Sequence, residues 1–366
     1  MKVLFIGGTG PTGLPIVRGL LDAGHDLTLV NRGLHPKPEQ AGIPTITADP
    51  YDEASLTAAL GSTTWDSVVA MYGRLRMIAR VTKGRCDHFV SIGGVPAYRG
   101  WTDPWQFDPP GLPVPVREDG ALVADESIDS KGYRIVRTED AVFDSHPSAA
   151  HFRYPYMYGP YQPVPREWSI VRRVLEGRTR MIVADDGLTL HHHGYTENVA
   201  AAVLRAILHP ELAGGTIFNV GDEEVLTIRQ VVELCARALG AEIELVSMPY
   251  DLAIPAWPLL AQPLPTHRVM DLSLLHHQLG HRDVLPAREA VRRTARWLAD
   301  NRPEPGGTEE SVLTDPFDYA AEDALMDSWL AARASVVMPQ FTTKPAYGLA
   351  YSGPTGRPRT QKEFVE

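Results

Sequence analysis

The fold of this chain is decided by the stretch KVLFIGGTGPTGLPIVRGLLDAGHDLTLV, residues 2–30. Val3–Ile6 and Leu27–Val30 are short aliphatic runs typical of buried strands, and the pattern of Thr12–Ala23 between them is helical. A strand, a helix and a second strand in this order form a βαβ unit, in which the crossover makes the two strands parallel. The loop between the first strand and the helix has the pattern GxxGxxG, which indicates a dinucleotide site at the start of the helix.

Each glycine of this loop has a physical role in such a site. Gly7 permits the tight turn, Gly10 lets backbone N–H groups approach a pyrophosphate, and Gly13 lets the helix pack closely with its positive end toward the phosphate. A generic glycine turn is the alternative, but the context of strand, loop and helix favours nucleotide binding. The residues of this loop that we expect to bind the cofactor are Gly7, Thr9, Gly10, Pro11, Thr12 and Gly13.

The ends of the second and third strands carry the residues expected to select the cofactor. Where an NAD enzyme usually has an acid for the ribose diol, this chain has Asn31 and Arg32. A guanidinium suits a 2′-phosphate, so the sequence favours NADP over NAD, although an arginine that stacks on adenine explains Arg32 as well. Asp49 is placed to accept a hydrogen bond from the adenine amino group, or else to cap the following helix.

The alternation of strands and helices continues beyond this unit and sets the fold class. Further elements are expected as strands at Ile43–Thr47, Ser67–Ala70, His88–Ile92 and Ala150–Tyr154 and as helices at Asp52–Leu60, Arg74–Thr82 and Tyr133–Ser145. Nearly continuous apolar strands separated by helices predict an α/β fold with a doubly wound, Rossmann-type parallel sheet. This domain is expected over residues 1–180, completed by about 195–225.

The rest of the chain is less regular. Residues 181–301 predict a smaller, discontinuous mixed lobe that binds substrate. The elements expected from here on are helices at Glu167–Leu175, Thr196–Leu208, Thr227–Leu239 and Arg288–Asn301 and strands at Met181–Val183, Ile217–Val220 and Glu242–Val246. Residues 302–366 predict a C-terminal tail with one amphipathic helix near Tyr319–Ala332, which is expected to cross to a second copy in a homodimer.

The composition of the chain limits the kinds of partner that it can bind. It carries 35 Lys and Arg against 45 Asp and Glu, and this net charge of -10 disfavours binding to the phosphate backbone of a nucleic acid. Cys86 and Cys235 form no disulfide framework or zinc-ribbon spacing, which favours a reducing compartment. No apolar stretch reaches the roughly 18 residues of a membrane helix, and the first apolar run is too short for an export signal. We therefore expect a cytoplasmic protein with a small-molecule substrate and with neither nucleic acid nor membrane as a partner.

Residues 95–130 interrupt the pattern with a long loop. Its prolines are Pro96, Pro104, Pro109, Pro110, Pro113 and Pro115. Because proline removes a backbone donor and fixes φ, this stretch predicts neither a helix nor a central strand. A loop of this length is either a lid over a ligand or a packed surface loop. Trp101, Trp105 and Phe107 accordingly either line an apolar or aromatic substrate site or anchor the loop.

Several separated motifs resemble those of the extended short-chain dehydrogenase/reductase superfamily, the NAD(P)-dependent epimerase/dehydratase family. These motifs are GGTGPTG at 7–13, Asp49, Tyr133 with Glu139, RYPYMYGP at 153–160, GYTENVA at 194–200 and FNVG at 218–221. They occur in the order of the family and span roughly residues 1–300. The resemblance implies a nicotinamide dinucleotide cofactor, which Tyr154 and Pro155 help to bind.

The resemblance also implies a catalytic set, from which this chain departs. The family uses a tyrosine, a lysine four residues later on the same helical face, and a serine or threonine near the end of the preceding strand. Tyr133 matches the tyrosine as general acid/base, and Arg137 stands in place of the lysine that holds the ribose. The usual hydroxyl falls on Gly93, so Ser91 either substitutes for it or bonds only backbone. Lys131 precedes Tyr133 by two residues and belongs to a different face.

On the substrate side, the arginine that clamps the diphosphate in nucleotide-sugar members is replaced by His191, His192 and His193. Arg268 matches a second phosphate-binding arginine or is an ordinary surface residue. In an extended segment only His191 and His193 share a face, and no third ligand is near in sequence, so no metal site is expected. The sequence thus predicts an NAD(P)-dependent oxidoreductase or epimerase for a small or aromatic carbonyl or alcohol compound. The alternative is a catalytically altered sensor or scaffold that binds the same cofactor.

Overall fold

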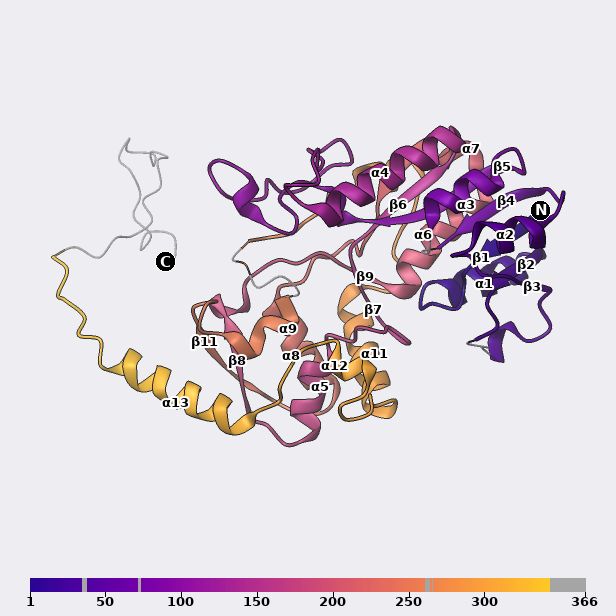
Figure 1. Ribbon diagram of the computed structural model, residues 1–366. Coiled ribbons are helices and arrows are strands. Elements are labelled where there is room, and N and C mark those ends of the chain that lie inside the picture. Colours follow the sequence, from indigo (N-terminus) through magenta and orange to yellow (C-terminus); the bar gives the residue numbers. More distant parts are fainter. Residues whose placement is uncertain (35–37, 72–73, 261–263, 265, 343–366) are drawn as a thin grey trace, which may run out of the picture. The chain divides into compact units, whose positions relative to one another are not determined.

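The structure is a computed structural model and describes residues 1–34, 38–71, 74–260, 264 and 266–342 (Figure 1). The chain forms two compact units, Met1–Tyr319 and a second one that begins at Ala320. The predicted C-terminal helix is present as α13 (Tyr319–Ala334). Within the described ranges, no helix is both long and apolar enough to cross a membrane.

A seven-stranded parallel sheet forms the centre of the first unit, in the order β10-β6-β5-β4-β1-β2-β3. Its strands are β1 (Lys2–Ile6), β2 (Asp26–Asn31), β3 (Thr45–Thr47), β4 (Trp65–Ala70), β5 (Cys86–Gly94), β6 (Ala150–Tyr154) and β10 (Thr216–Asn219). All neighbouring strands run parallel, so their carboxyl ends meet at one edge. The strand order reverses at β1, and doubly wound sheets bind ligands at such a switch point. The predicted Rossmann-type α/β fold is confirmed.

Helices cover both faces of this sheet because successive residues of a strand point to opposite sides. The covering helices are α1 (Gly13–Asp22), α2 (Glu53–Leu60), α3 (Leu75–Thr82), α4 (Ser130–Ser145) and α6 (Thr196–Leu208). Phe5 of β1 packs in the core that contains α1 and α6. Its neighbour Leu4 packs on the other face, in the core that contains α2, α3 and α4. The central strands are therefore buried on both sides, as their continuous apolar sequences predicted.

The other elements of the first unit include helices and two short pairs of parallel strands. They include β7 (Tyr156–Tyr158), α5 (Trp168–Leu175), β8 (Arg180–Ala184), β9 (His193–Tyr195), α8 (Ile228–Ala238), β11 (Glu244–Met248), α10 (Ser273–Gln278) and α11 (Ala287–Asp300). β8 pairs with β11, and β7 pairs with β9. The elements expected here from the sequence are present with ends shifted by a residue or two, whereas the pair of β7 and β9 was not expected.

Residues 95–130 form a loop that is packed against the rest of the unit. The side chain of Trp101 is fully buried, and its carbonyl oxygen accepts a hydrogen bond from Nε of Arg268 at 2.8 Å. Phe107 is partly buried against the same cluster, while Trp105 is 63% exposed. None of these three aromatic side chains lines either of the two cavities described below. Trp101 and Phe107 therefore anchor the loop by packing, whereas Val95 and Pro96 at its start line the second cavity, so a lid over a ligand stays a prediction.

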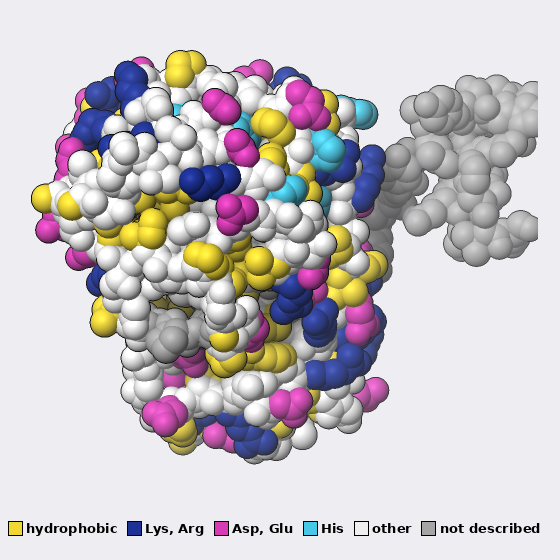
Figure 2. Space-filling view, turned by 90° about the vertical axis from the view of Figure 1, so that its right-hand side faces the viewer, with side chains coloured by type: hydrophobic (Ala, Val, Ile, Leu, Met, Phe, Trp, Pro, Cys, Tyr) yellow, Lys and Arg dark blue, Asp and Glu magenta, His cyan; other side chains and the backbone are white. Residues whose placement is uncertain are grey.

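Charged side chains of both signs lie on the surface shown in Figure 2. On this face Lys and Arg alternate with Asp and Glu, and hydrophobic groups lie between them. A surface of one sign attracts ligands of the opposite charge over a long range, and a mixed surface does not.

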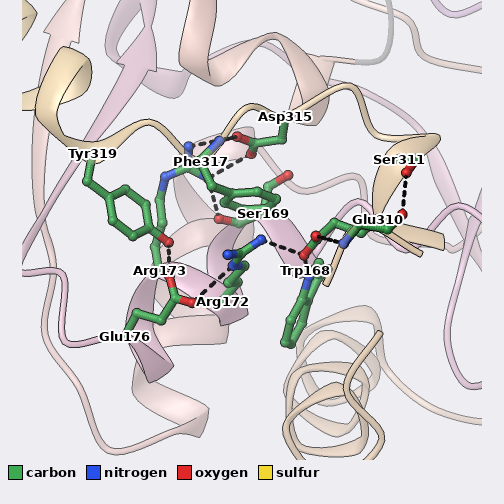
Figure 3. A network of polar contacts seen from close by, with 11 residues as sticks. Trp168, Ser169, Arg172, Arg173, Glu176, Glu310, Ser311, Asp315, Phe317 and Tyr319 are labelled. Carbon is green, nitrogen blue, oxygen red and sulfur yellow. Dashed lines mark hydrogen bonds and ion pairs between the residues drawn. The ribbon is translucent and has the colours of Figure 1, made fainter. Parts of the chain in front are cut away.

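Residues 302–319 belong to the first unit, although a separate tail was expected from residue 302. Polar contacts join this segment to α5 (Figure 3). Asp315 accepts hydrogen bonds from the guanidinium of Arg173 at 2.7 and 3.0 Å, and both side chains are buried. Glu310 accepts one from Arg172 at 2.6 Å. Two carboxylates paired with arginines of α5 therefore attach this segment. The predicted boundary at 301 does not separate compact units, and the one at 180 stays a prediction.

Candidate active site

The loop between β1 and α1 has a backbone that favours glycine. Gly7 and Gly8 have φ of +104° and +85°, in the left-handed region. A Cβ on Gly13 would stand 2.6 Å from backbone atoms of Gly8, so only glycine lets α1 begin this close to the loop. A Cβ on Gly10 would meet nothing within 4 Å, so this position faces open space. The open side of Gly10, at the start of a helix, fits the pyrophosphate of a dinucleotide.

A cavity of about 160 Å³ lies beside this loop, at the carboxyl ends of β1 and β2. Its lining includes Gly7, Thr9, Asn31, Arg32 and Tyr51. The guanidinium of Arg32 lies over the ring of Tyr51, 5.6 Å from the ring centroid. The structure thus brings the first part of the loop together with the two residues predicted to select the cofactor. An aromatic ring and a cation at one cavity suit an adenosine that carries a phosphate.

Other predicted cofactor residues do not line this cavity. Thr12 is the buried residue directly before α1, and Pro11 precedes it in a turn. The carboxylate of Asp49 accepts a hydrogen bond from the backbone N–H of Tyr51 at 2.9 Å. The N-cap of α2 is Asp52, which accepts from two backbone N–H groups of the first turn. The capping alternative for Asp49 is therefore wrong, and its carboxylate shapes the turn that carries Tyr51.

A second cavity, of about 530 Å³, lies at the carboxyl ends of β5 and β6. One wall is a face of α4 that consists of Ser130, Lys131, Arg134, Ile135 and Thr138. These positions follow the helical repeat of 3.6 residues, so their side chains lie on one side of the helix. The other walls consist of Leu75, Ile92, Gly93, Gly94, Val95, Pro96, His151, Tyr154, Pro155 and Tyr156. Tyr154 and Pro155, which the resemblance assigns to the cofactor, therefore lie at this cavity.

Tyr133 and Arg137 lie on another face of α4. Residues two positions apart on a helix differ by about 200° in direction. Arg137 is exposed and pairs with Asp140 at 3.3 Å, Tyr133 is half-buried, and neither of the predicted pair lines either cavity. The structure does not bring the predicted catalytic pair to the site. The cavity face of α4 instead carries Lys131 and, four residues later, Ile135.

The predicted hydroxyl of Ser91 does not reach the second cavity either. Ser91 is fully buried, and its Oγ lies 2.7 Å from Nδ1 of His151, which lines the cavity. A Cβ on Gly93 would stand 2.3 Å from Nε2 of the same ring. This Nε2 has no hydrogen-bond partner among the described residues and lies 3.5 Å from Glu139. An imidazole from β6 therefore fills the space where the resemblance places a hydroxyl from β5.

A buried ion pair lies next to His151. Two guanidinium nitrogens of Arg153 donate to the two carboxylate oxygens of Glu139, at 2.9 and 2.6 Å. Burial favours a high pKa for Glu139, but the hydrogen bonds and charge of Arg153, with a contribution from His151, lower this pKa to about 2. Glu139 is therefore ionised at neutral pH. A fixed carboxylate beside Nε2 favours the tautomer with its hydrogen on Nε2, and Nδ1 then accepts from the hydroxyl of Ser91.

None of the three histidines of the run lines the second cavity, although the ring of His191 packs against Tyr156, which does. The rings of His191 and His193 are 4.7 Å apart, which confirms that these two share a face, and Nε2 of His192 donates to a backbone carbonyl at 2.8 Å. Burial lowers the pKa of His192 to about 4 and that of His193 to about 3. In the part of the chain that the structure describes, no group of three His, Cys, Asp or Glu is placed to hold a metal. Arg268 is buried, so it is not an ordinary surface residue, and its match to a phosphate-binding arginine stays a prediction.

Comparison with curated proteins finds distant relatives, and no family model matches the chain. It is 27% identical over 260 residues to the 3-diazoavenalumate denitrifying reductase of a Streptomyces species, over 66% of this chain and 82% of that protein. It is 24% identical over 257 residues to the chloroplast stem-loop binding protein of 41 kDa b of Arabidopsis thaliana, over 65% of this chain and 63% of that protein. A match of 103 residues to an uncharacterized Sinorhizobium fredii protein is 32% identical and spans 28% of each. The chain thus spans less than two thirds of the last two proteins.

Comparison with solved structures decides the fold. The structure of a UDP-glucose 4-epimerase from Thermotoga maritima with UDP-glucose matches with a TM-score of 0.65 and 17% identity, over 83% of this chain and 100% of that chain. The enzyme WbmG of Bordetella bronchiseptica with NAD and UDP matches with a TM-score of 0.62 and 17% identity, over 82% and 94%. The chain has the fold of the nucleotide-sugar epimerases. The resemblance drawn from the sequence is confirmed for this epimerase fold, in which both cavities lie at the carboxyl edge of the sheet.

Proposed function

We propose that this protein is an NADP(H)-preferring oxidoreductase or epimerase that acts on a small, largely apolar or aromatic carbonyl or alcohol compound. The observation that carries the proposal is the presence of two cavities at the carboxyl edge of one parallel sheet. One cavity lies beside the glycine loop and Arg32, and the other has mainly apolar walls. Sheets of this type bind a dinucleotide across this edge, and the structure of WbmG contains NAD.

The residues of the second cavity define what this chain itself contributes. A bound nicotinamide supplies hydride transfer to or from a carbon atom. The apolar walls exclude water from that carbon, and His151 is the imidazole that lines the cavity. Ser91 at Nδ1 and Glu139 near Nε2 hold the ring in one orientation, as a general acid/base requires. We assign to Nε2 of His151 the proton that the substrate oxygen gains or loses.

Replacement of His151 by glutamine tests this assignment. We expect His151→Gln to lower turnover by about 10²–10⁴-fold, the usual contribution of a general acid/base, and to leave cofactor affinity almost unchanged. Tyr133→Phe removes only a hydroxyl on another face of α4, so we expect it to keep the wild-type rate. The measurement is the loss of NADPH absorbance with a panel of aromatic aldehydes and ketones. A large loss of turnover in Tyr133→Phe, with none in His151→Gln, would instead assign the general acid/base to Tyr133, with Arg137 beside it.

The choice of cofactor is tested independently at Arg32. We expect Arg32→Ala to weaken the binding of NADPH by about 10–100-fold and to leave that of NADH unchanged, because a hydrogen bond between charged groups contributes about 1.5–3 kcal/mol. Calorimetric titration of both cofactors measures this. Arg18→Ala is the matched control, since Arg18 is an exposed residue of α1 that does not line the cavity. If Arg32→Ala weakened the binding of NADPH and of NADH equally, Arg32 would be assigned to stacking on adenine.

A second candidate function is a protein that senses or carries the cofactor without turnover. The cavity face of α4 favours this candidate, because it has Lys131 and Ile135 in place of a tyrosine and a lysine. Tight binding of NADPH with no oxidation across the carbonyl panel would support it. Stem-loop binding, which the name of the chloroplast relative describes, is not favoured, since the net charge is -10 and the charges on the face in Figure 2 are mixed.

A further inference from the structure

We infer that the second cavity binds an apolar or aromatic carboxylate and that Lys131 and Arg134 of α4 hold its carboxylate group. The inference deepens the proposed function by naming the substrate class of the same site. The inference rests on the proposed function only where it calls the ligand a substrate. The binding of the ligand is measured without turnover and does not depend on that function.

The lining of this cavity is cationic although the chain is acidic. Lys131 and Arg134 contribute two positive charges, and no Asp or Glu is among the described residues that line the cavity. The whole chain, by contrast, has more acidic than basic residues, 45 against 35. Nε2 of His151 adds a buried polar atom that has no hydrogen-bond partner in the described part of the chain. A partly enclosed wall with cations and without carboxylates is complementary to an anion.

Both cations are available to a ligand. Lys131 is exposed at the start of α4 and forms no hydrogen bond or ion pair with any residue that the structure describes. Arg134 pairs with Glu126 at 3.3 Å, but the two side chains are 69% and 56% exposed. An ion pair this exposed to water is weak, so Arg134 can contact a ligand carboxylate while Glu126 stays nearby.

The remainder of the cavity suits an apolar body. Leu75, Ile92, Val95 and Ile135 supply aliphatic walls, and its volume of about 530 Å³ is typical of a site for a small molecule. Most of its wall surface is apolar, so the hydroxyl groups of a sugar or the oxygens of a diphosphate would lose their contacts with water without equal replacement. A compact apolar molecule with one charged group at the α4 side matches this distribution.

A single negative charge fits this wall better than a double one. Glu126 already shares the charge of Arg134, so the net charge that these three groups offer is close to one unit. A dianionic phosphate would bring its second charge toward the carboxylate of Glu126, which repels it. The geometry therefore favours a carboxylate over a phosphate monoester.

The test compares acids with neutral analogues on the full chain saturated with NADP⁺. Calorimetry measures the binding of trans-cinnamate and of methyl cinnamate, and that of benzoate and phenyl phosphate. We expect cinnamate to bind at least about 10-fold more tightly than its ester, and Lys131→Gln and Arg134→Gln each to remove about 10-fold of the affinity for cinnamate only. Arg137→Gln is the matched control, because it removes a cation from another face of the same helix. Lys131→Arg is expected to keep the preference, and thermal unfolding checks each variant.

Three results would overturn the inference. The first is that cinnamate and its ester bind equally tightly or not at all. The second is that Arg137→Gln loses as much affinity for cinnamate as the two cavity variants do. The third is that phenyl phosphate binds more tightly than benzoate. The proposed function fails separately. If cinnamate binds with the expected preference but no carbonyl compound is reduced, the ligand class stands and the oxidoreductase does not. If neutral aldehydes are reduced and acids are not preferred, the oxidoreductase stands and the carboxylate site does not.

Discussion

Replacement of Gly10 by alanine is expected to weaken the binding of NADPH and NADH by about 10–100-fold while leaving the free energy of unfolding unchanged. A Cβ at this position meets nothing within 4 Å in the protein, so the folded chain accommodates it. The same methyl group stands on the open side of the loop, where the backbone must approach the pyrophosphate. Loss of one hydrogen bond to a charged group accounts for an effect of this size. Calorimetry of both cofactors, together with chemical denaturation, measures the two quantities.

Gly13→Ala is the matched variant, and its effect should differ in kind. Its Cβ would stand 2.6 Å from the backbone of Gly8, so α1 must move away from the loop. We therefore expect both a lower free energy of unfolding and weaker cofactor binding. If a folded Gly10→Ala protein bound both cofactors as tightly as the wild type, the glycine loop would not be the pyrophosphate site, and the proposed function would lose its main support.

Sequence reasoning predicted the sheet well because the relevant signals are local. Each central strand is a continuous apolar run, since both of its faces are covered, and each boundary is marked by a turn or a helical pattern. The glycine loop is largely local as well, because Gly7 has a positive φ and Gly13 packs against the backbone of Gly8. Residues 302–319 could not be assigned in this way. What holds Glu310 and Asp315 is α5, more than a hundred positions earlier in the chain.

Helix α4 shows how an offset of two residues along a helix displaces a predicted site. The spacing of Tyr133 and Arg137 is right for one face of a helix, but spacing alone does not say which face points to the cavity. The buried acid Glu139 was the available marker, since it follows Ile135 by four residues and Lys131 by eight. A rotation of about 200° separates that face from the predicted one. Lys131 was placed correctly on a different face from Tyr133, but the face of Tyr133 was taken to be the one at the cavity.

His151 was not among the predicted site residues, for a different reason. It is an ordinary member of an apolar strand in the sequence, and its importance comes from the pairing of β5 with β6, which places His151 opposite Ser91. No local pattern specifies that register across about 60 residues of intervening loop and helix. The missing side chain at Gly93 was visible in the sequence, but what fills its space was not.

Replacement of Arg153 by methionine is expected to lower the free energy of unfolding by about 3–5 kcal/mol near neutral pH, because it leaves the carboxylate of Glu139 buried and uncompensated. The guanidinium also lies over the ring of Tyr98, 4.6 Å from the centroid, and this contact is lost with it. Chemical denaturation measures the change. Arg137→Met is the matched control on the surface, and we expect it to change the stability by no more than about 0.5 kcal/mol, since its pair with Asp140 is exposed to water.

The pH dependence of stability distinguishes the loss of this ion pair from a simple packing defect, because only the ion pair makes the difference in stability change with pH. In the wild type the pKa of Glu139 falls from its ordinary value of 4.5 to about 2, through the combined effect of Arg153 and His151 against burial. The ion pair therefore contributes its full stability above pH 4.5, and this contribution is lost as the pH falls toward 2. In Arg153→Met the burial remains without the guanidinium, so the pKa of Glu139 rises and the carboxyl group is neutral in mild acid. The difference in stability between the two proteins should thus be largest near pH 7 and shrink below about pH 4.5. A difference that stays constant from pH 7 to pH 3 would attribute the loss to packing and would mean that Glu139 is not held ionised beside His151.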